Sequence, residues 1–214
     1  MRTHTAETQA TMTPKKALQF LKEGNQRFTN NLKANRNLMD QVEKTGAGQF
    51  PFATILHCID SRTSAELIFD QGIGDIFSIR IAGNFVNDDI LGSMEFASKI
   101  AGTKLILVMG HTQCGAIKGA CDHVKMGNLT TLLSKLNPVV NMVEPEFEIK
   151  GSGNAELVQK VADENVHYTI QQILLRSPIL KEMIDKGELG LVGSMYDISS
   201  GEVSVFESDT FVGM

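Results

Sequence analysis

The sequence predicts an α/β fold in which helices cover both faces of a central, mostly parallel sheet. Short, nearly continuous apolar segments of strand length alternate along the chain with segments of helical patterning, and this alternation is typical of a parallel sheet buried on both sides. The 214 residues contain no internal repeat, no low-complexity tract and no linker-like stretch. We therefore expect a single domain over residues 1–214.

The N-terminal part is expected to form a helical arm that follows a flexible tail over residues 1–12. Thr13 is suited to cap a helix whose first turn contains Pro14, and Gly24 marks the expected end of that helix. A second amphipathic segment runs from residue 25 to about residue 44.

Apolar residues recur along one side of both arm segments, namely Ala17, Leu18 and Leu21 in the first and Phe28 and Leu32 in the second. A sheet already covered by its own helices leaves little room for these faces. We therefore expect the arm, residues 13–44, to be a dimerisation element that packs across a twofold-related copy of the chain.

Four apolar segments are predicted to form the parallel core of the sheet, namely residues 52–57, 76–80, 104–109 and 188–193. The turn signal at residues 199–201 precedes a fifth strand over residues 203–206, which we expect to be a hairpin arm. Helices are expected over residues 64–69, 89–100 and 115–185, the last with interruptions near 137–138 and at 151–153.

Composition and charge narrow the function classes. The net charge of -5 and the lack of a basic stripe interleaved with aromatics argue against a nucleic-acid partner. No apolar run approaches the roughly 18 residues of a membrane span, and the N-terminus lacks the apolar core of a secretory signal. Three cysteines do not make a disulfide framework, so a cytoplasmic location is expected.

Three residues form the strongest chemical signal in the chain: Cys58, His111 and Cys114. Two thiolates and one imidazole are a suitable zinc set, and three protein ligands leave one coordination position for water, as in catalytic zinc sites. We therefore expect one Zn²⁺ per chain, held by these three side chains.

The predicted elements would bring the three ligands together. Cys58 and His111 each fall just past the C-terminal end of a predicted parallel strand, and ligand sites of open α/β sheets lie at those ends. Cys114 is three residues after His111, a spacing that puts both on one face of the first turn of the next helix. The N-terminus of that helix also favours the anionic thiolate of Cys114.

Asp60 and Arg62 follow Cys58 closely and suit the control of a proton on the metal's water. An ionised Asp60 can accept a hydrogen bond from that water and so orient it. Arg62 can hold the carboxylate in a two-point pair, which keeps Asp60 ionised and off the metal. The sequence thus predicts a zinc enzyme that uses hydroxide as its nucleophile.

These residues resemble the motifs of the β-class carbonic anhydrases. The resemblance covers residues 14–206 and rests on Cys58-x-Asp-Ser-Arg62, Gly74-Asp-Ile-Phe-x-x-Arg80-x-Ala-Gly-Asn84 and Gly110-His-x-x-Cys-Gly115, supported by Gly24-Asn-Gln-Arg-Phe28, Ser93-x-Glu-Phe-Ala97 and Gly193-x-x-Tyr-Asp-x-x-x-Gly201. It implies reversible hydration of CO2 to bicarbonate and a proton by a zinc-bound hydroxide. It also implies a four-stranded sheet of order 2-1-3-4 with an added edge strand, and assembly into homodimers or homotetramers.

The family has two forms of site, and this chain resembles the open, plant-like one. That form carries a glutamine nine residues before the first cysteine, here Gln49, whereas the other form carries a tryptophan at the position of Ile55. The resemblance assigns substrate binding to Gln49, Phe77, Ala82, Gly83, Phe96 and Gly115. Phe96 stands where the plant-like form often has tyrosine.

Two other functions remain open at this stage. Relatives of the same scaffold hydrolyse CS2 or COS with the same zinc set. A zinc-binding regulatory protein without turnover is the other alternative, and the presence of both Asp60 and Arg62 argues against it. The residue that passes the proton to solvent is not singled out, with His57, His123, Asp88 and Asp89 as candidates.

Overall fold

A five-stranded sheet is the centre of the molecule, which we describe from a computed structural model over residues 3–211. The strand order is β2-β1-β3-β4-β5; β1 to β4 are parallel and β5 is antiparallel to β4. The strands are β1 (Ala53–His57), β2 (Ile76–Arg80), β3 (Leu105–His111), β4 (Gly190–Tyr196) and β5 (Val203–Phe211). The predicted fold class, strand order and hairpin are confirmed.

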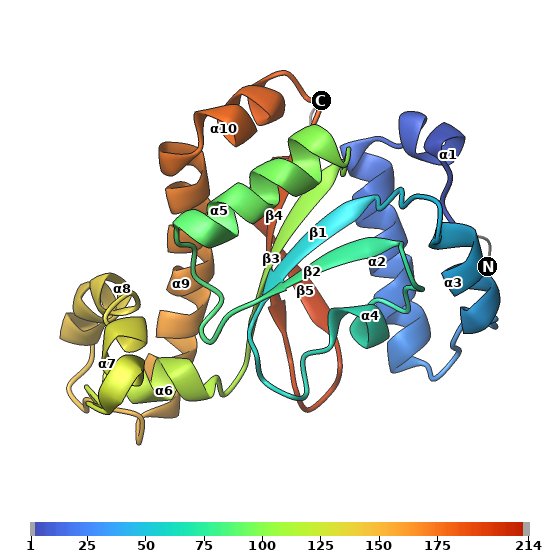
Figure 1. The fold of residues 1–214 in the computed structure, drawn as a ribbon. Coiled ribbons are helices and arrows are strands. Elements are labelled where there is room, and N and C mark those ends of the chain that lie inside the picture. Colours follow the sequence, from blue (N-terminus) through green and yellow to red (C-terminus); the bar gives the residue numbers. More distant parts are fainter. Residues whose placement is uncertain (1–2, 212–214) are drawn as a thin grey trace.

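Helices cover both faces of the sheet (Figure 1). Helices α2 (Pro14–Thr29) and α4 (Ala65–Ile68) pack on one face. The opposite face is covered by α5 (Asp88–Glu95), α6 (Gly115–Cys121), α7 (Gly127–Leu133), α8 (Asn137–Val143), α9 (Ala155–Arg176) and α10 (Pro178–Asp185). The remaining helical segments are α1 (Ala6–Ala10), α3 (Leu38–Thr45), a π-helical turn at Phe96–Ile100 and a 3-10 turn at Glu144–Glu146.

Strand β3 shows how one apolar segment serves two cores. Leu105, Leu107 and Met109 point to the face covered by α2, and Ile106 and Val108 point to the face covered by α9. All of them are buried. Because successive side chains of a strand alternate between faces, this stretch of β3 contributes apolar side chains to both cores.

Two strands extend past glycines that look like breaks in the sequence. Strand β3 includes Gly110 and β4 includes Gly193, although the sequence predicted strands ending at 109 and at 193. A Cβ at Gly110 would lie 2.8 Å from Val166, and one at Gly193 would lie 3.0 Å from Ile170. These glycines permit the close approach of α9 to the sheet and do not end the strands.

Helix α2 starts as predicted but does not end at Gly24. The side chain of Thr13 accepts a hydrogen bond from the Lys16 backbone N–H, and Pro14 occupies the first turn. The helix then continues through Gly24 to Thr29. A Cβ at Gly24 would lie 1.8 Å from the carbonyl oxygen of Phe69, so this glycine lets α2 contact the end of α4.

The apolar face of α2 packs on the chain's own sheet. Ala17, Leu18 and Leu21 are buried against β1, β3 and β4, so the expectation that these residues need a partner surface was wrong: the parallel sheet leaves this face free for α2. The arm still exposes Leu32, Leu38, Met39 and Val42. Its role in dimerisation stays a prediction that rests on those residues.

The predicted flexible tail is an ordered segment over its described residues, 3–12. Thr5 caps helix α1, and the Gln9 side-chain amide donates to the carbonyl oxygens of Pro51 and Ala101, each at 2.8 Å. Met12 is buried in the core beneath α2. Because this segment is mostly polar, the sequence did not indicate these contacts. Residues 1–2 of the predicted tail lie outside the described residues.

The loop between α2 and α3 is held by one buried carboxylate. Asp70 is 5% exposed and accepts from Arg27 Nε at 2.6 Å, from Arg36 Nη1 at 2.5 Å and from the backbone N–H of Ala34 at 3.1 Å. Burial alone would raise the pKa of Asp70, but the hydrogen bonds from the two arginines outweigh burial and lower it. Asp70 therefore stays charged, and both of its carboxylate oxygens accept hydrogen bonds.

Among the described residues, no helix combines the length and apolarity needed to cross a membrane.

Candidate metal centre

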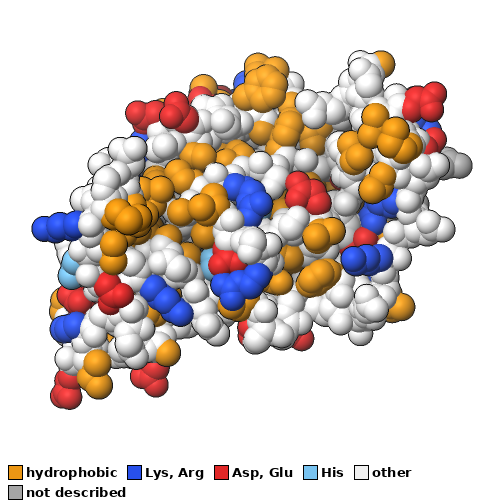
Figure 2. All heavy atoms as spheres, turned by 60° about the horizontal axis from the view of Figure 1, so that its bottom comes forward, with side chains coloured by type: hydrophobic (Ala, Val, Ile, Leu, Met, Phe, Trp, Pro, Cys, Tyr) orange, Lys and Arg blue, Asp and Glu red, His pale blue; other side chains and the backbone are white. Residues whose placement is uncertain are grey.

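The strand order has a switch point between its two central strands. From the neighbouring strands β1 and β3 the order runs outward in opposite directions, to β2 and to β4 and β5. Open α/β sheets place their ligand sites at the carboxyl ends of the strands that flank such a point. These ends point to the bottom of Figure 1, and Figure 2 brings that side forward, with acidic and basic side chains among apolar ones near the middle of the face.

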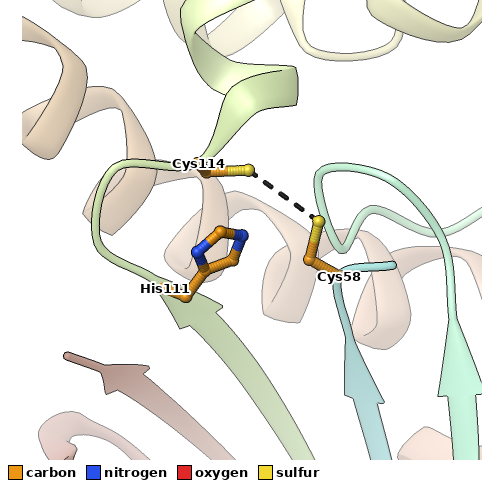
Figure 3. Close-up of side chains that lie close together, drawn as sticks. All are labelled: Cys58, His111 and Cys114. Atoms are coloured by element: carbon orange, nitrogen blue, oxygen red, sulfur yellow. Dashed lines mark hydrogen bonds between the residues drawn. The ribbon is translucent and has the colours of Figure 1, made fainter. Parts of the chain in front are cut away.

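Cys58, His111 and Cys114 meet at these strand ends, as the sequence predicted (Figure 3). Cys58 follows β1, His111 is the last residue of β3 and Cys114 is the N-cap of α6. One possible ligand atom of each lies within 4.8 Å of those of the others, and the two sulfur atoms are 3.9 Å apart. All three side chains are buried.

The hydrogen bonding of His111 leaves one ring nitrogen free for a metal. Its Nδ1 lies 3.0 Å from the carbonyl oxygen of Thr112, to which it donates, so Nε2 carries the lone pair. That Nε2 is buried and has no hydrogen-bond partner. A buried nitrogen lone pair beside two thiols is the donor set that zinc accepts, and the carbonyl contact fixes the ring as outer partners of metal-bound histidines do.

The two cysteines differ in how readily they lose a proton. Hydrogen bonds to the Cys58 sulfur, chiefly from Cys114 and also from the backbone N–H groups of Gly83 and Asp60, lower the pKa of Cys58. The same Cys58 thiolate raises the pKa of Cys114, and burial raises it further. The two thiols therefore share a proton, and a bound cation would favour the second thiolate.

Asp60, two residues after Cys58, is paired with Arg62. Arg62 Nε donates to Oδ1 at 2.9 Å, Nη2 donates to Oδ2 at 2.7 Å, and the Arg62 backbone N–H donates to Oδ1 at 2.9 Å. The Arg62 guanidinium holds the pKa of Asp60 well below its ordinary value. Asp60 is thus a carboxylate with a fixed orientation, as the sequence predicted.

Two residues that the sequence analysis gave no role support the loop that carries Cys58 and Asp60. Arg80 donates to the carbonyl oxygens of Cys58 at 3.2 Å and Asp60 at 2.8 Å. The Thr63 hydroxyl lies 3.1 Å and 2.8 Å from the same two oxygens. The resemblance contained Arg80 as a motif residue, but only the fold shows that it reaches across from β2.

The expected substrate residues fall into two groups. Gly83 donates its backbone N–H to Cys58 Sγ at 3.5 Å, Ala82 precedes it, and Gly115 begins α6 next to Cys114. Gln49 precedes β1 and is exposed, at the opposite end of that strand from Cys58. Within one chain, Gln49 therefore does not join the cluster of Cys58, His111 and Cys114.

Phe77 and Phe96 also lie away from the metal ligands. Phe77 pairs with Thr54 near the start of β1, and its ring centroid is 6.4 Å from that of Phe96. Both line a cavity of about 570 Å³ beside β2, the edge strand. Phe96 is 53% exposed, so the two rings offer an open apolar surface.

Of the four candidates for proton exit, His57 is the nearest to the ligands in sequence and the least suited. It is fully buried and its Nε2 lies 2.8 Å from the Ser78 hydroxyl. Burial, with the charge of Arg80, lowers the pKa of His57 to about 4. His123, Asp88 and Asp89 are exposed.

Comparison with known proteins gives one consistent family. The family model described as carbonic anhydrase matches residues 53–203. Carbonic anhydrase 2 of Mycobacterium tuberculosis is 35% identical over 189 residues, which covers 88% of this chain and 90% of that protein.

Two solved structures have the same fold. The β-carbonic anhydrase CcaA superposes with a TM-score of 0.72 at 26% identity, over 93% of each chain. A tetrameric β-carbonic anhydrase of the fungus Sordaria macrospora superposes with a TM-score of 0.70 at 25% identity, over 79% of this chain and 90% of that one.

Proposed function

The chain belongs to the β-class carbonic anhydrase family, and from this premise we propose that it hydrates CO2 reversibly at a zinc ion held by Cys58, His111 and Cys114. The observation that carries the zinc assignment is the unpartnered, buried Nε2 of His111 beside two buried thiols. When bound, zinc would lower the pKa of a water molecule and so supply a nucleophile near neutral pH.

Asp60 and Arg62 would control the proton of that water. The Asp60 carboxylate can accept a hydrogen bond from it, which orients a lone pair toward the carbon atom of CO2. Arg62 binds both oxygens of Asp60 and so keeps the carboxylate from ligating the metal. This pairing supports the open form of the site, with water as the fourth ligand.

We further propose that the enzyme is a homo-oligomer in which Gln49, Phe77 and Phe96 act on a second copy's metal centre. These residues lie away from their own Cys58. Phe77 belongs to the edge strand β2 and Phe96 lies beside it, whereas Gln49 precedes the neighbouring strand β1. The half-open apolar surface of Phe77 and Phe96 suits a nonpolar gas once a partner closes it. The tetrameric relative from Sordaria macrospora supports an oligomer.

A reducing compartment such as the cytoplasm fits the same site. Cys58 and Cys114 have sulfur atoms 3.9 Å apart, close enough that a small movement would allow a disulfide under oxidising conditions. A disulfide would remove two metal ligands. The function therefore needs both thiols reduced or already on zinc.

The decisive experiment combines stopped-flow CO2 hydration with metal analysis of the same protein sample. We expect about one zinc per chain and turnover that is lost with the metal. Hydrolysis of CS2 and COS should be assayed in parallel. Zinc-loaded protein that hydrolyses either of them but leaves CO2 unchanged would refute the proposed substrate.

A further inference from the structure

Helix α9 carries a buried amide that reaches the loop after β2. Asn165 is 1% exposed, and its Nδ2 donates to the carbonyl oxygen of Gly83 at 2.8 Å. One turn later, the Thr169 hydroxyl donates to the carbonyl oxygen of Asn84 at 3.3 Å. A polar residue on the buried face of a helix costs free energy unless it is hydrogen-bonded, so these contacts need an explanation.

Gly83 connects this amide to the metal centre. Its N–H donates to Cys58 Sγ at 3.5 Å while its carbonyl accepts from Asn165. Its φ of +80° is a conformation that favours glycine, and a Cβ at this position would lie 2.9 Å from Leu136. The N–H of Gly83 therefore points at the sulfur, while the carbonyl group of the same residue is held by Asn165 of α9.

The same turn of α9 also supports the second ligand segment. Val166 follows Asn165, and a Cβ placed on Gly110, the residue before His111, would lie 2.8 Å from Val166. Neighbouring residues of one helix thus contact both segments that deliver ligands.

We propose that Asn165 is a positioning residue that, through Gly83, aims a hydrogen bond at the Cys58 sulfur and thereby sets the donor strength of that thiolate toward the metal. The inference rests on the proposed zinc centre. Hydrogen bonds to a metal-bound sulfur withdraw electron density from it, and outer partners of this kind change metal affinity about 10-fold to 100-fold.

The test uses Asn165→Leu, which keeps a similar volume and removes the donor. In the cobalt-substituted protein we expect the thiolate-to-cobalt charge-transfer band to move to lower energy than in the wild type, because a sulfur that accepts a weaker hydrogen bond from Gly83 gives up an electron more easily. Zinc affinity, measured by competition with a chromogenic chelator, should change about 10-fold. Asn165→Ala, which also removes the donor, should move the band in the same direction.

Thr169→Val is the matched control. It removes a buried hydrogen bond from the same helix to the same loop, but to Asn84, whose carbonyl is not tied to Cys58. We expect its cobalt band and zinc affinity to match the wild type. An equal shift in Thr169→Val, or wild-type bands in both Asn165 variants, would overturn the positioning role. If the wild-type protein itself shows no thiolate-to-cobalt band, the proposed metal centre fails instead.

Discussion

Arg62 binds both carboxylate oxygens of Asp60, with Nε–Oδ1 at 2.9 Å and Nη2–Oδ2 at 2.7 Å. The two residues are separated by one position in sequence, and the backbone N–H of Arg62 closes the contact from the same side. This geometry fixes the direction in which Asp60 can accept another hydrogen bond.

Replacing Asp60 tests that role directly. Asp60→Asn should retain zinc but lower kcat/KM for CO2 hydration by about 100-fold to 10,000-fold, because the amide cannot supply the negative charge. Arg62 holds the pKa of Asp60 well below its ordinary value, so the aspartate stays ionised from about pH 6 to about pH 9 and the loss should be the same across that range. Asp185→Asn, which breaks an exposed pair with Lys181, is the control; near-normal turnover in Asp60→Asn would make the aspartate purely structural.

The ligand set predicts a clear contrast among the three cysteines. Cys58→Ser and Cys114→Ser should each lower the zinc content to well under one per chain and abolish hydration, because both sulfurs lie in the cluster with His111. Cys121→Ser changes a buried thiol outside that cluster and should keep both. Metal analysis after dialysis against a weak chelator checks this, and full zinc retention by both ligand variants would refute the site.

Mixed dimers can decide whether Gln49 acts across an interface. A dimer of one Cys58→Ser chain and one Gln49→Ala chain, isolated with two affinity tags, would contain one complete site if Gln49 comes from the partner. We expect it to recover up to about half of the wild-type kcat/KM, as one of two sites is restored. A dimer of Cys58→Ser with Asp60→Asn should stay inactive, since those two residues act within one chain. Equal inactivity of both mixtures would place Gln49 at the metal centre of its own subunit, and an active Gln49→Ala homodimer would place it outside the site.

Asp70 is expected to contribute strongly to stability. Asp70→Asn would leave Arg27 and Arg36 without their carboxylate and should lower the free energy of unfolding by about 3 to 5 kcal/mol. Because the folded-state pKa of Asp70 is lowered, this contribution is complete above about pH 4 and disappears only as the pH falls through the lowered value. Urea denaturation between about pH 4 and about pH 8 should show a constant difference from the wild type. Asp40→Asn, an exposed pair with Lys44, should cost less than about 1 kcal/mol.

Two glycines make a matched pair for the packing of α2. Gly24→Ala would place a Cβ 1.8 Å from the Phe69 carbonyl oxygen, so we expect a loss of about 3 kcal/mol or more. Gly92→Ala, in α5, meets nothing within 4 Å and should stabilise the protein by about 0.5 to 1 kcal/mol through helix propensity. Thermal denaturation measures both. Wild-type stability in Gly24→Ala would mean that α2 and α4 are farther apart than described.

The sequence predicted the sheet and the clustering of two cysteines with a histidine because both depend on local patterns. Continuous apolar strands and ligands at strand ends follow from periodicity and topology, and Cys58, His111 and Cys114 do converge as expected. Glycine was the main source of error. Gly24 and Gly110 were taken as ends of elements, whereas each permits a close contact with a distant segment.

Contacts between segments that are distant in the chain could also not be predicted from the sequence. Asn165 follows Gly83 by 82 residues and Arg80 follows Cys58 by 22, and no spacing rule relates them. The arm shows the same limit: an amphipathic helix needs an apolar surface, but only the fold shows that the surface for Ala17 and Leu21 belongs to the same chain.

Ligands carried by two separate strands also couple metal supply to folding. Zinc would join the end of β1 to the end of β3, and an unfolded chain does not hold Cys58 and His111 together. Free zinc at about 100 times its dissociation constant would add about 2.7 kcal/mol to the free energy of unfolding. A cell that runs short of zinc would then contain less folded protein, and proteases would degrade the chains that stay unfolded.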